Sequence, residues 1–326
     1  MSRRLLAVIL FVLVAVPSLA GQTRRSTQPR TPDGQPDLQG FWTNATFTPL
    51  ERPKGVTKEL YTKEEAAEAE KRLKSEDAAQ TEPGTVADVH YDFTQFGLDT
   101  AQAPYSSTLR TSLIVDPPDG KLPPLSAEGQ KRAAERAEQA RRVGRWDSAQ
   151  SNELDDRCII FAGAGPPMLP QSYNSNYQIV QAPGYVMILF EMAHDVRLIP
   201  LDGRPHLSPD LRQWIGDSRG RWEGDTLVIE TTNFNGKNPL QGSSANMRLV
   251  ERFTRVDPDT LLYKFTVEDS STWTRPWSAE MPLRKTIGPL FEHACHEGNR
   301  GLYNTLAGKR LEEKKAAEEA ARKETR

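Results

Sequence analysis

The chain has 326 residues, with 42 basic and 44 acidic side chains and a formal net charge of −2. A nucleic-acid-binding protein would need a clustered basic excess, so this balance predicts no nucleic-acid partner. The length is enough for one substantial hydrophobic core, and no internal repeat at a fixed period is visible.

The N-terminus has the pattern of a signal peptide. A basic head, MSRR, precedes residues 5–16, an uninterrupted apolar run of 12 residues that is short for a membrane span. Small residues follow in PSLAG, so we predict cleavage after Ala20 and removal of residues 1–20. The mature protein is then exported, periplasmic or secreted, with no membrane span. A retained N-terminal anchor is the alternative.

The composition divides the mature chain into three parts. Residues 21–36 are polar, rich in Pro and without periodicity, which predicts a disordered leader. We expect a single β-rich domain over residues 37–307, with helical insertions near 62–79 and 126–143. Residues 308–326 predict a charged helical tail. All three helical segments are rich in Ala, Glu, Lys and Arg, so they should lie on the surface.

Strand-length apolar runs fill the rest of the chain. Asp-Gly, Glu-Gly-Asp and Asp-Pro-Asp turn signals separate them, and no helix alternates with the strands. In LLYKFTVED the side chains of Leu261, Tyr263 and Phe265 share one face, an alternation typical of antiparallel sheets with one wet face. We therefore predict a mainly β fold, an antiparallel β-barrel or sandwich with peripheral surface helices.

The densest group of polar residues is the stretch EMAHDVRLIPLDGRPH, residues 191–206. Glu191 ends an apolar strand and Arg197 begins the returning strand, so the two are expected to pair across a hairpin. One interpretation is a structural ion pair. The other is a cofactor-independent hydrolase, lyase or isomerase, with Glu191, His206 and Glu297 as catalytic groups and Arg197 binding an anion. In this hypothesis burial raises the Glu191 pKa and Arg197 lowers it.

The leading functional hypothesis is an exported binder of a small, partly apolar molecule. Barrels of this kind hold ligands in their mouths among apolar side chains and a few placed polar groups. Asp202, Arg204 and His206 would supply the polar contacts. A structural or interaction protein that docks through its charged helices is a further alternative, and the sequence does not indicate the oligomeric state.

The stretch TWTRPW predicts an aromatic cluster. Alternation along a strand would place Trp273, Arg275 and Trp277 on one face, with the Arg275 guanidinium stacked between two indoles. Such a cluster either closes one end of the barrel or forms a binding platform for a sugar or an aromatic ligand.

The two cysteines, Cys158 and Cys295, predict a disulfide, because the chain is expected to be exported. The bridge would bring Arg157, His296 and Glu297 into one neighbourhood, with His296 as a binding residue. Two buried free thiols are the alternative.

No metal and no organic cofactor are predicted. Several side chains have the chemistry of zinc ligands, namely His194, His206, His296, Glu191 and Glu297. However, the chain contains no HExxH and no CxxC motif. AGAGPP, residues 162–167, lacks the Lys-Ser/Thr that follows in a phosphate loop, and GDSRG lacks the spacing of a nucleophile elbow.

Long motifs carry a resemblance to a known family. They include QIVQAPGYVMILFEMAHDVRLIPLDGRPH, GRWEGDTLVIETTNF, LVERFTRVDPDTLLYKFTVEDSSTWTRPW and ACHEGN. On these motifs the chain resembles a family of exported proteins of unknown function that occurs in many copies per genome in soil bacteria. The resemblance runs from PDLQGFW to CHEGN, nearly the whole mature chain, and implies no particular reaction. The matching positions are Cys158, Glu191, Arg197, Asp202, Gly203, Arg204, His206, Trp222, Asp225, Glu251, Arg252, Asp269, Arg275, Cys295 and Glu297.

The strand-rich half is also similar to lipocalin-like barrels in its alternation and turns. This second resemblance concerns the fold alone.

Overall fold

The structure is a computed structural model that describes residues 28–77, 108–161, 164–171 and 173–324. The predicted signal peptide lies outside these ranges. Ten strands of the described chain form one antiparallel sheet: β1 (Gly40–Thr43), β2 (Ile114–Asp116), β3 (Asn176–Ala182), β4 (Tyr185–Phe190), β5 (Val196–Pro200), β6 (Asp217–Glu223), β7 (Thr226–Thr232), β8 (Arg248–Asp257), β9 (Thr260–Glu268) and β10 (Trp277–Lys285).

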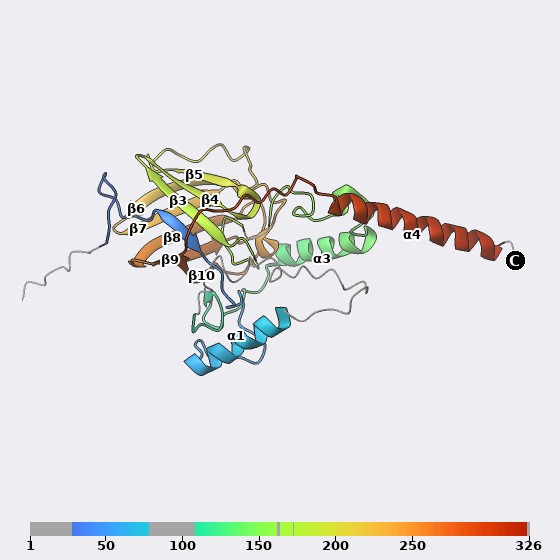
Figure 1. Cartoon of the computed structure of the whole chain (residues 1–326), viewed down its shortest axis with the longest axis horizontal. Coiled ribbons are helices and arrows are strands. Elements are labelled where there is room, and N and C mark those ends of the chain that lie inside the picture. Colours follow the sequence, from blue (N-terminus) through green and yellow to red (C-terminus); the bar gives the residue numbers. More distant parts are fainter. Residues whose placement is uncertain (1–27, 78–107, 162–163, 172, 325–326) are drawn as a thin grey trace, which may run out of the picture.

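The sheet curls into a nearly closed barrel. Figure 1 shows the curled sheet. Hydrogen-bonded neighbours follow the order β5-β4-β3-β1-β10-β9-β8-β7-β6, and β2 pairs with the first part of β10. Tight turns join β3 to β4, β6 to β7 and β8 to β9; Gly184 and Gly224, with φ of 77° and 60°, provide the left-handed backbone in the first two. The prediction of a mainly β barrel with peripheral helices is confirmed.

The barrel interior follows from the alternation of the sequence. On β9 every second side chain from Leu261 to Val267 is buried, and Leu249, Glu251 and Phe253 are buried in the same way on β8. Aromatic side chains fill the centre, with Tyr263 lying 4.7 Å from Phe253 and 5.7 Å from Phe265 between ring centroids. Offset and edge-to-face aromatic pairs add to the free energy gained by burying their area.

The barrel closes between β5 and β6 without a hydrogen-bonded ladder. These strands stand at the two ends of the strand order, yet the side chains of Ile199 and Leu201 pack closely against Gly220. A methyl group on Gly220 would lie 2.6 Å from Leu201 and 2.9 Å from Ile199. We call this line of contact between β5 and β6 the seam. The close packing at the seam requires glycine at position 220.

The mouth is the end of the barrel at which β3, β6 and β8 begin, and a loop fills its centre. We call residues 164–171 the plug. Its Met168 is fully buried, with its N–H donating to the Tyr263 hydroxyl at 3.0 Å and its carbonyl accepting from the Asn44 amide at 3.1 Å. A Cβ on Gly165 would lie 2.5 Å from the Phe190 ring, so only glycine fits there.

The described part of the chain has three α-helices, which lie outside the barrel: α1 (Lys63–Asp77), α3 (Ala127–Arg142) and α4 (Gly301–Glu324) (Figure 1). Ser126 caps α3 by accepting from Gly129 N–H, and the helix docks at the mouth end, where Gly129 packs against the backbone of Thr272. The helix α4 begins seven residues before the predicted tail. Within the described ranges, no helix has both the length and the apolar character of a membrane span.

Of the segment predicted to be a disordered leader, residues 21–36, the structure describes residues 28–36. Its described portion folds back on itself, with a bridge between Arg30 and Pro36 and a turn around Gly34. Arg30 also forms an ion pair with Asp225 at 2.7 Å. Composition alone did not reveal these long-range contacts.

Candidate functional site

The mouth of the barrel carries a pocket of about 290 Å³, close to the lower end of the about 300–1,000 Å³ of small-molecule sites. One wall is the plug, the opposite wall is the loop that joins β7 to β8, and Trp214 is added by the loop that joins β5 to β6. The described residues that line it are Gly165, Pro166, Pro167, Leu169, Pro170, Gln171, Trp214, Phe234, Asn238, Pro239, Leu240, Gln241 and Met247.

None of these described lining residues is charged. Their polar side chains are three amides, on Gln171, Asn238 and Gln241, set among Pro, Leu, Met and aromatic groups. Trp214 is 37% exposed, so part of its indole is open, while Phe234, which also lines the pocket, is buried. The lining therefore suits an uncharged, partly apolar molecule.

Below the plug, a polar network crosses the interior of the barrel. The Arg197 side chain is 2% exposed and pairs in a bidentate manner with Glu251, which is fully buried. The same guanidinium donates to Ser218 at 2.8 Å and to Thr231 at 2.6 Å, and the Tyr263 hydroxyl donates to Glu251 at 2.8 Å. Burial and the Glu251 charge raise the Tyr263 pKa well above its ordinary value, which keeps the phenol protonated.

The expected pairing of Glu191 with Arg197 is wrong. A short 3₁₀ turn follows β4, in which Ala193 and His194 have positive φ, and the register places Arg197 opposite Ile188. Arg197 therefore points into the barrel with Ile188, toward β6, β7 and β8. Glu191 lies beyond the end of its strand and faces other partners.

Glu191 is buried, with 1% of its surface exposed, beneath residues 286–299, which we call the strap. Its carboxylate accepts from the Asn176 amide at 3.2 and 3.3 Å and from the Phe291 N–H at 3.3 Å. Burial raises the Glu191 pKa above its ordinary 4.5, although these hydrogen bonds and the charge of His194 act in the opposite direction.

This shift predicts a pH-dependent contribution to stability. The pKa of Glu191 is higher in the folded protein than in the unfolded chain. The protonated carboxyl therefore stabilises the fold fully below about pH 4.5, and this stabilisation is lost as pH rises through the folded pKa. Glu191→Gln removes the titrating group, so its melting temperature relative to wild type should rise as pH increases from about 4.5 through the folded pKa of Glu191, and then level off. Calorimetric scans across this range test it, with Glu292→Gln, an exposed change on the strap, as control. Parallel curves for wild type and Glu191→Gln would refute the assignment.

His206 lies on the outer face of β6 and β7. Its Nδ1 is 2.9 Å from the Asp217 carboxylate, and its Nε2 is 3.7 Å from Glu230. Burial alone raises the Asp217 pKa, but hydrogen bonds from Leu207 N–H, His206 and Arg219 outweigh it and lower the pKa overall. These contacts hold the β5–β6 loop onto the barrel wall.

Asp202 and Arg204 form an exposed pair at the opposite end of the barrel from the mouth. Arg204 also donates to the Tyr185 hydroxyl at 3.0 Å, and its guanidinium lowers the Asp202 pKa to about 2. Together with His206, these residues were expected to provide the polar contacts of a ligand at the mouth. None of the three lines the pocket described above.

The stacking predicted for Arg275 is wrong. The strand β10 begins only at Trp277, so Trp273 and Arg275 belong to the preceding turn and strand alternation does not apply. The two indoles are buried and meet each other edge to face at 5.7 Å. Arg275 is exposed and pairs with Asp116.

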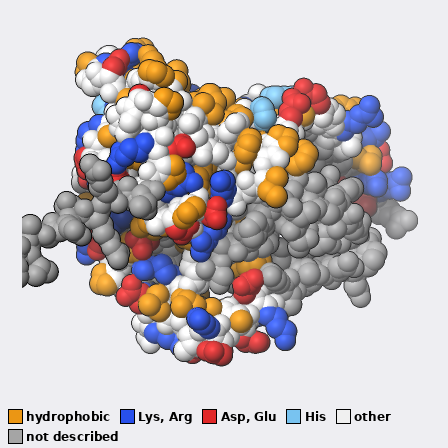
Figure 2. Space-filling view, turned by 60° about the vertical axis from the view of Figure 1, so that its left-hand side comes forward, with side chains coloured by type: hydrophobic (Ala, Val, Ile, Leu, Met, Phe, Trp, Pro, Cys, Tyr) orange, Lys and Arg blue, Asp and Glu red, His pale blue; other side chains and the backbone are white. Residues whose placement is uncertain are grey.

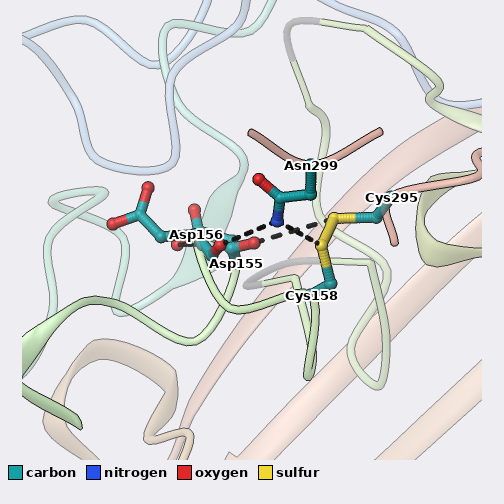
Figure 3. The surroundings of a disulfide bond; sticks show 5 residues. All are labelled: Asp155, Asp156, Cys158, Cys295 and Asn299. Atoms are coloured by element: carbon teal, nitrogen blue, oxygen red, sulfur yellow. Dashed lines mark hydrogen bonds between the residues drawn. A yellow bond between two sulfur atoms is a disulfide. The ribbon is translucent and has the colours of Figure 1, made fainter. Parts of the chain in front are cut away.

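The predicted disulfide between Cys158 and Cys295 is confirmed (Figure 3). It ties the strap to the segment that leads into the plug. The Asn299 amide donates to the Asp156 carbonyl at 3.3 Å and lies 3.2 Å from the Cys158 sulfur, while the Asp155 carbonyl oxygen is 3.9 Å from the Cys295 sulfur. The bridge therefore fixes two segments that flank the mouth.

The candidate catalytic residues do not form one cluster. His296 and Glu297 are exposed on the strap beside the disulfide. Within the described chain, no hydrogen bond or ion pair joins Glu191, His206 and Glu297 to one another. Their catalytic roles stay predictions.

In the described ranges, no group of three or more His, Cys, Asp or Glu side chains is arranged to hold a metal ion. Basic and acidic side chains are interspersed on the face shown in Figure 2.

Sequence reasoning missed the pocket because loops build it. Most of its described lining comes from the stretches GPPMLPQ and NFNGKNPLQG, which show no periodicity, and Trp214 is added by the β5–β6 loop. Both stretches combine Gly and Pro with amide side chains and flank predicted strands, and this shared composition is the signal that was available.

Comparison with known proteins found no matching family model, no matching curated protein and no matching solved structure. The likeness to the exported family therefore rests on its motifs, and the nearly closed antiparallel barrel is compatible with the lipocalin-like resemblance at the level of architecture.

Proposed function

We propose that this protein is an exported binder of a small, uncharged and partly apolar molecule, held in the pocket at the mouth of the barrel. The observation that carries this proposal is the lining of that pocket, which joins an open indole and several apolar groups to three amides. Export is supported by the signal-peptide pattern and by the disulfide.

Two features favour a pocket that is preorganised for binding. The plug is anchored through both backbone groups of Met168, and the disulfide fixes the chain just before it. A wall that is already ordered loses little conformational entropy when a ligand binds, which favours affinity.

The first test uses the neutral fluorescent probe N-phenyl-1-naphthylamine. Trp214 contributes the exposed aromatic surface, so Trp214→Ala should weaken binding of the probe by about tenfold or more, as loss of a central aromatic contact does. Trp146→Ala is the matched control, because Trp146 does not line the pocket and contacts Arg145 instead. Equal binding by both variants would exclude this pocket as the binding site.

A further inference from the structure

The chemistry of the pocket narrows the class of ligand. The first restriction is charge. Because the described lining carries no acidic or basic side chain, a charged ligand would enter without a partner and lose its hydration. The ammonium of Lys237 lies 6.0 Å from the centroid of the Trp214 ring, but it is not part of the lining.

The second restriction is hydrogen bonding. Proline has no backbone N–H, so the four prolines of the described lining reduce the number of main-chain donors. These prolines are Pro166, Pro167, Pro170 and Pro239. Donors must therefore come mainly from the amides, and each amide also presents an accepting oxygen.

The amides approach from two sides of the pocket. Gln171 belongs to the plug, where its Nε2 donates to the Leu169 carbonyl at 3.3 Å and keeps a second N–H and an oxygen for a ligand. Asn238 and Gln241 stand on the opposite wall. A pure hydrocarbon would bury these groups without partners, whereas a ligand with several hydroxyls can both donate to them and accept from them.

The third restriction is the shape of the ligand. The negative face of the Trp214 indole attracts polarised C–H groups. A pyranose presents such C–H groups on a flat side and carries hydroxyls around its rim. A phenol also stacks, but its one or two hydroxyls would leave the remaining amides unpaired. We propose, as an extension of the function proposed above, that the pocket binds a neutral sugar of one or two pyranose rings stacked on Trp214.

The experiment is saturation-transfer NMR and calorimetric titration of the full mature chain with a matched panel. The panel contains methyl glucoside and cellobiose as neutral sugars, and glucuronate and glucosamine as charged relatives. Cyclohexanol and catechol represent rings with fewer hydroxyls. The neutral sugars should bind most tightly, with saturation concentrated on their C–H groups.

Variants connect the binding to the site. Trp214→Ala should weaken sugar binding about tenfold or more, and Asn238→Ala or Gln241→Ala about three- to tenfold. Trp146→Ala is the control and should leave it unchanged. Circular dichroism verifies that each variant is folded; a variant that fails this check is replaced by Trp214→Phe, which keeps a smaller stacking surface and should bind with intermediate affinity.

The outcomes separate the two proposals. If catechol or cyclohexanol binds through Trp214 and the neutral sugars do not, the sugar assignment is overturned while the small-molecule function stands. If the charged sugars bind more tightly than the neutral ones, the restriction on charge is wrong and the assignment fails. If neither the panel nor the naphthylamine probe binds in a manner that depends on Trp214, both proposals fall.

Discussion

Arg197→Met should destabilise the fold by about 3–5 kcal/mol, because it leaves the Glu251 carboxylate buried without its partner. The double variant Arg197→Met/Glu251→Leu should recover much of that loss, since it removes both charges together. Urea unfolding of the wild type, both single variants and the double variant measures the coupling free energy directly.

The matched control is Arg204→Met on the exposed Asp202–Arg204 pair, where both side chains are more than 40% exposed. This change should leave the free energy of unfolding nearly unchanged, because water screens and solvates such charges. If the Arg197 and Arg204 variants lose the same stability, the interior network does not hold the barrel together.

Removal of the disulfide should have the second large effect. The bridge joins residues separated by 137 positions, for which the chain-entropy relation gives about 5 kcal/mol, and measured losses for native bridges run from about 2 to 5 kcal/mol. The variant Cys158→Ser/Cys295→Ser should therefore unfold at a clearly lower urea concentration than the oxidised wild type.

Two measurements make this result specific. Reductant should lower the urea concentration at which the wild type unfolds toward that of the double variant. It should not change the unfolding of the double variant itself. Hydrogen exchange should increase first in the plug and the strap, because these are the segments that the bridge ties together. Uniformly faster exchange throughout the barrel, with no local change, would contradict this role.

The sequence predicts the strands well where one face is wet. On β8 and β9 the alternation of apolar and polar residues coincides with the observed burial, and turn signals mark the ends of these strands. Alternation and turn signals do not predict the short strand β1. Its pairing with β3 and β10 joins residues more than 100 positions apart, and no local pattern specifies a partner at that distance.

The errors at the candidate site have a common physical origin. The hairpin rule placed Arg197 beside Glu191, but the left-handed residues after β4 set a different register and directed the guanidinium to Glu251. The alternation rule placed Arg275 between two indoles, although that segment is a turn. In both cases a few backbone angles decided which side chains meet, and composition does not determine those angles.

The close approach at Gly220 has a consequence for association with other chains. Strands β5 and β6 have no ladder between them, and such edges ordinarily template pairing with a foreign strand. At the seam the side chains of Ile199 and Leu201 occupy the space beside Gly220, where a single added methyl would lie within 3 Å of both, so an intruding strand would have to displace them. Because these side chains oppose the insertion of a foreign strand between β5 and β6, we expect the barrel to resist edge-to-edge aggregation although its hydrogen-bonded circle is incomplete.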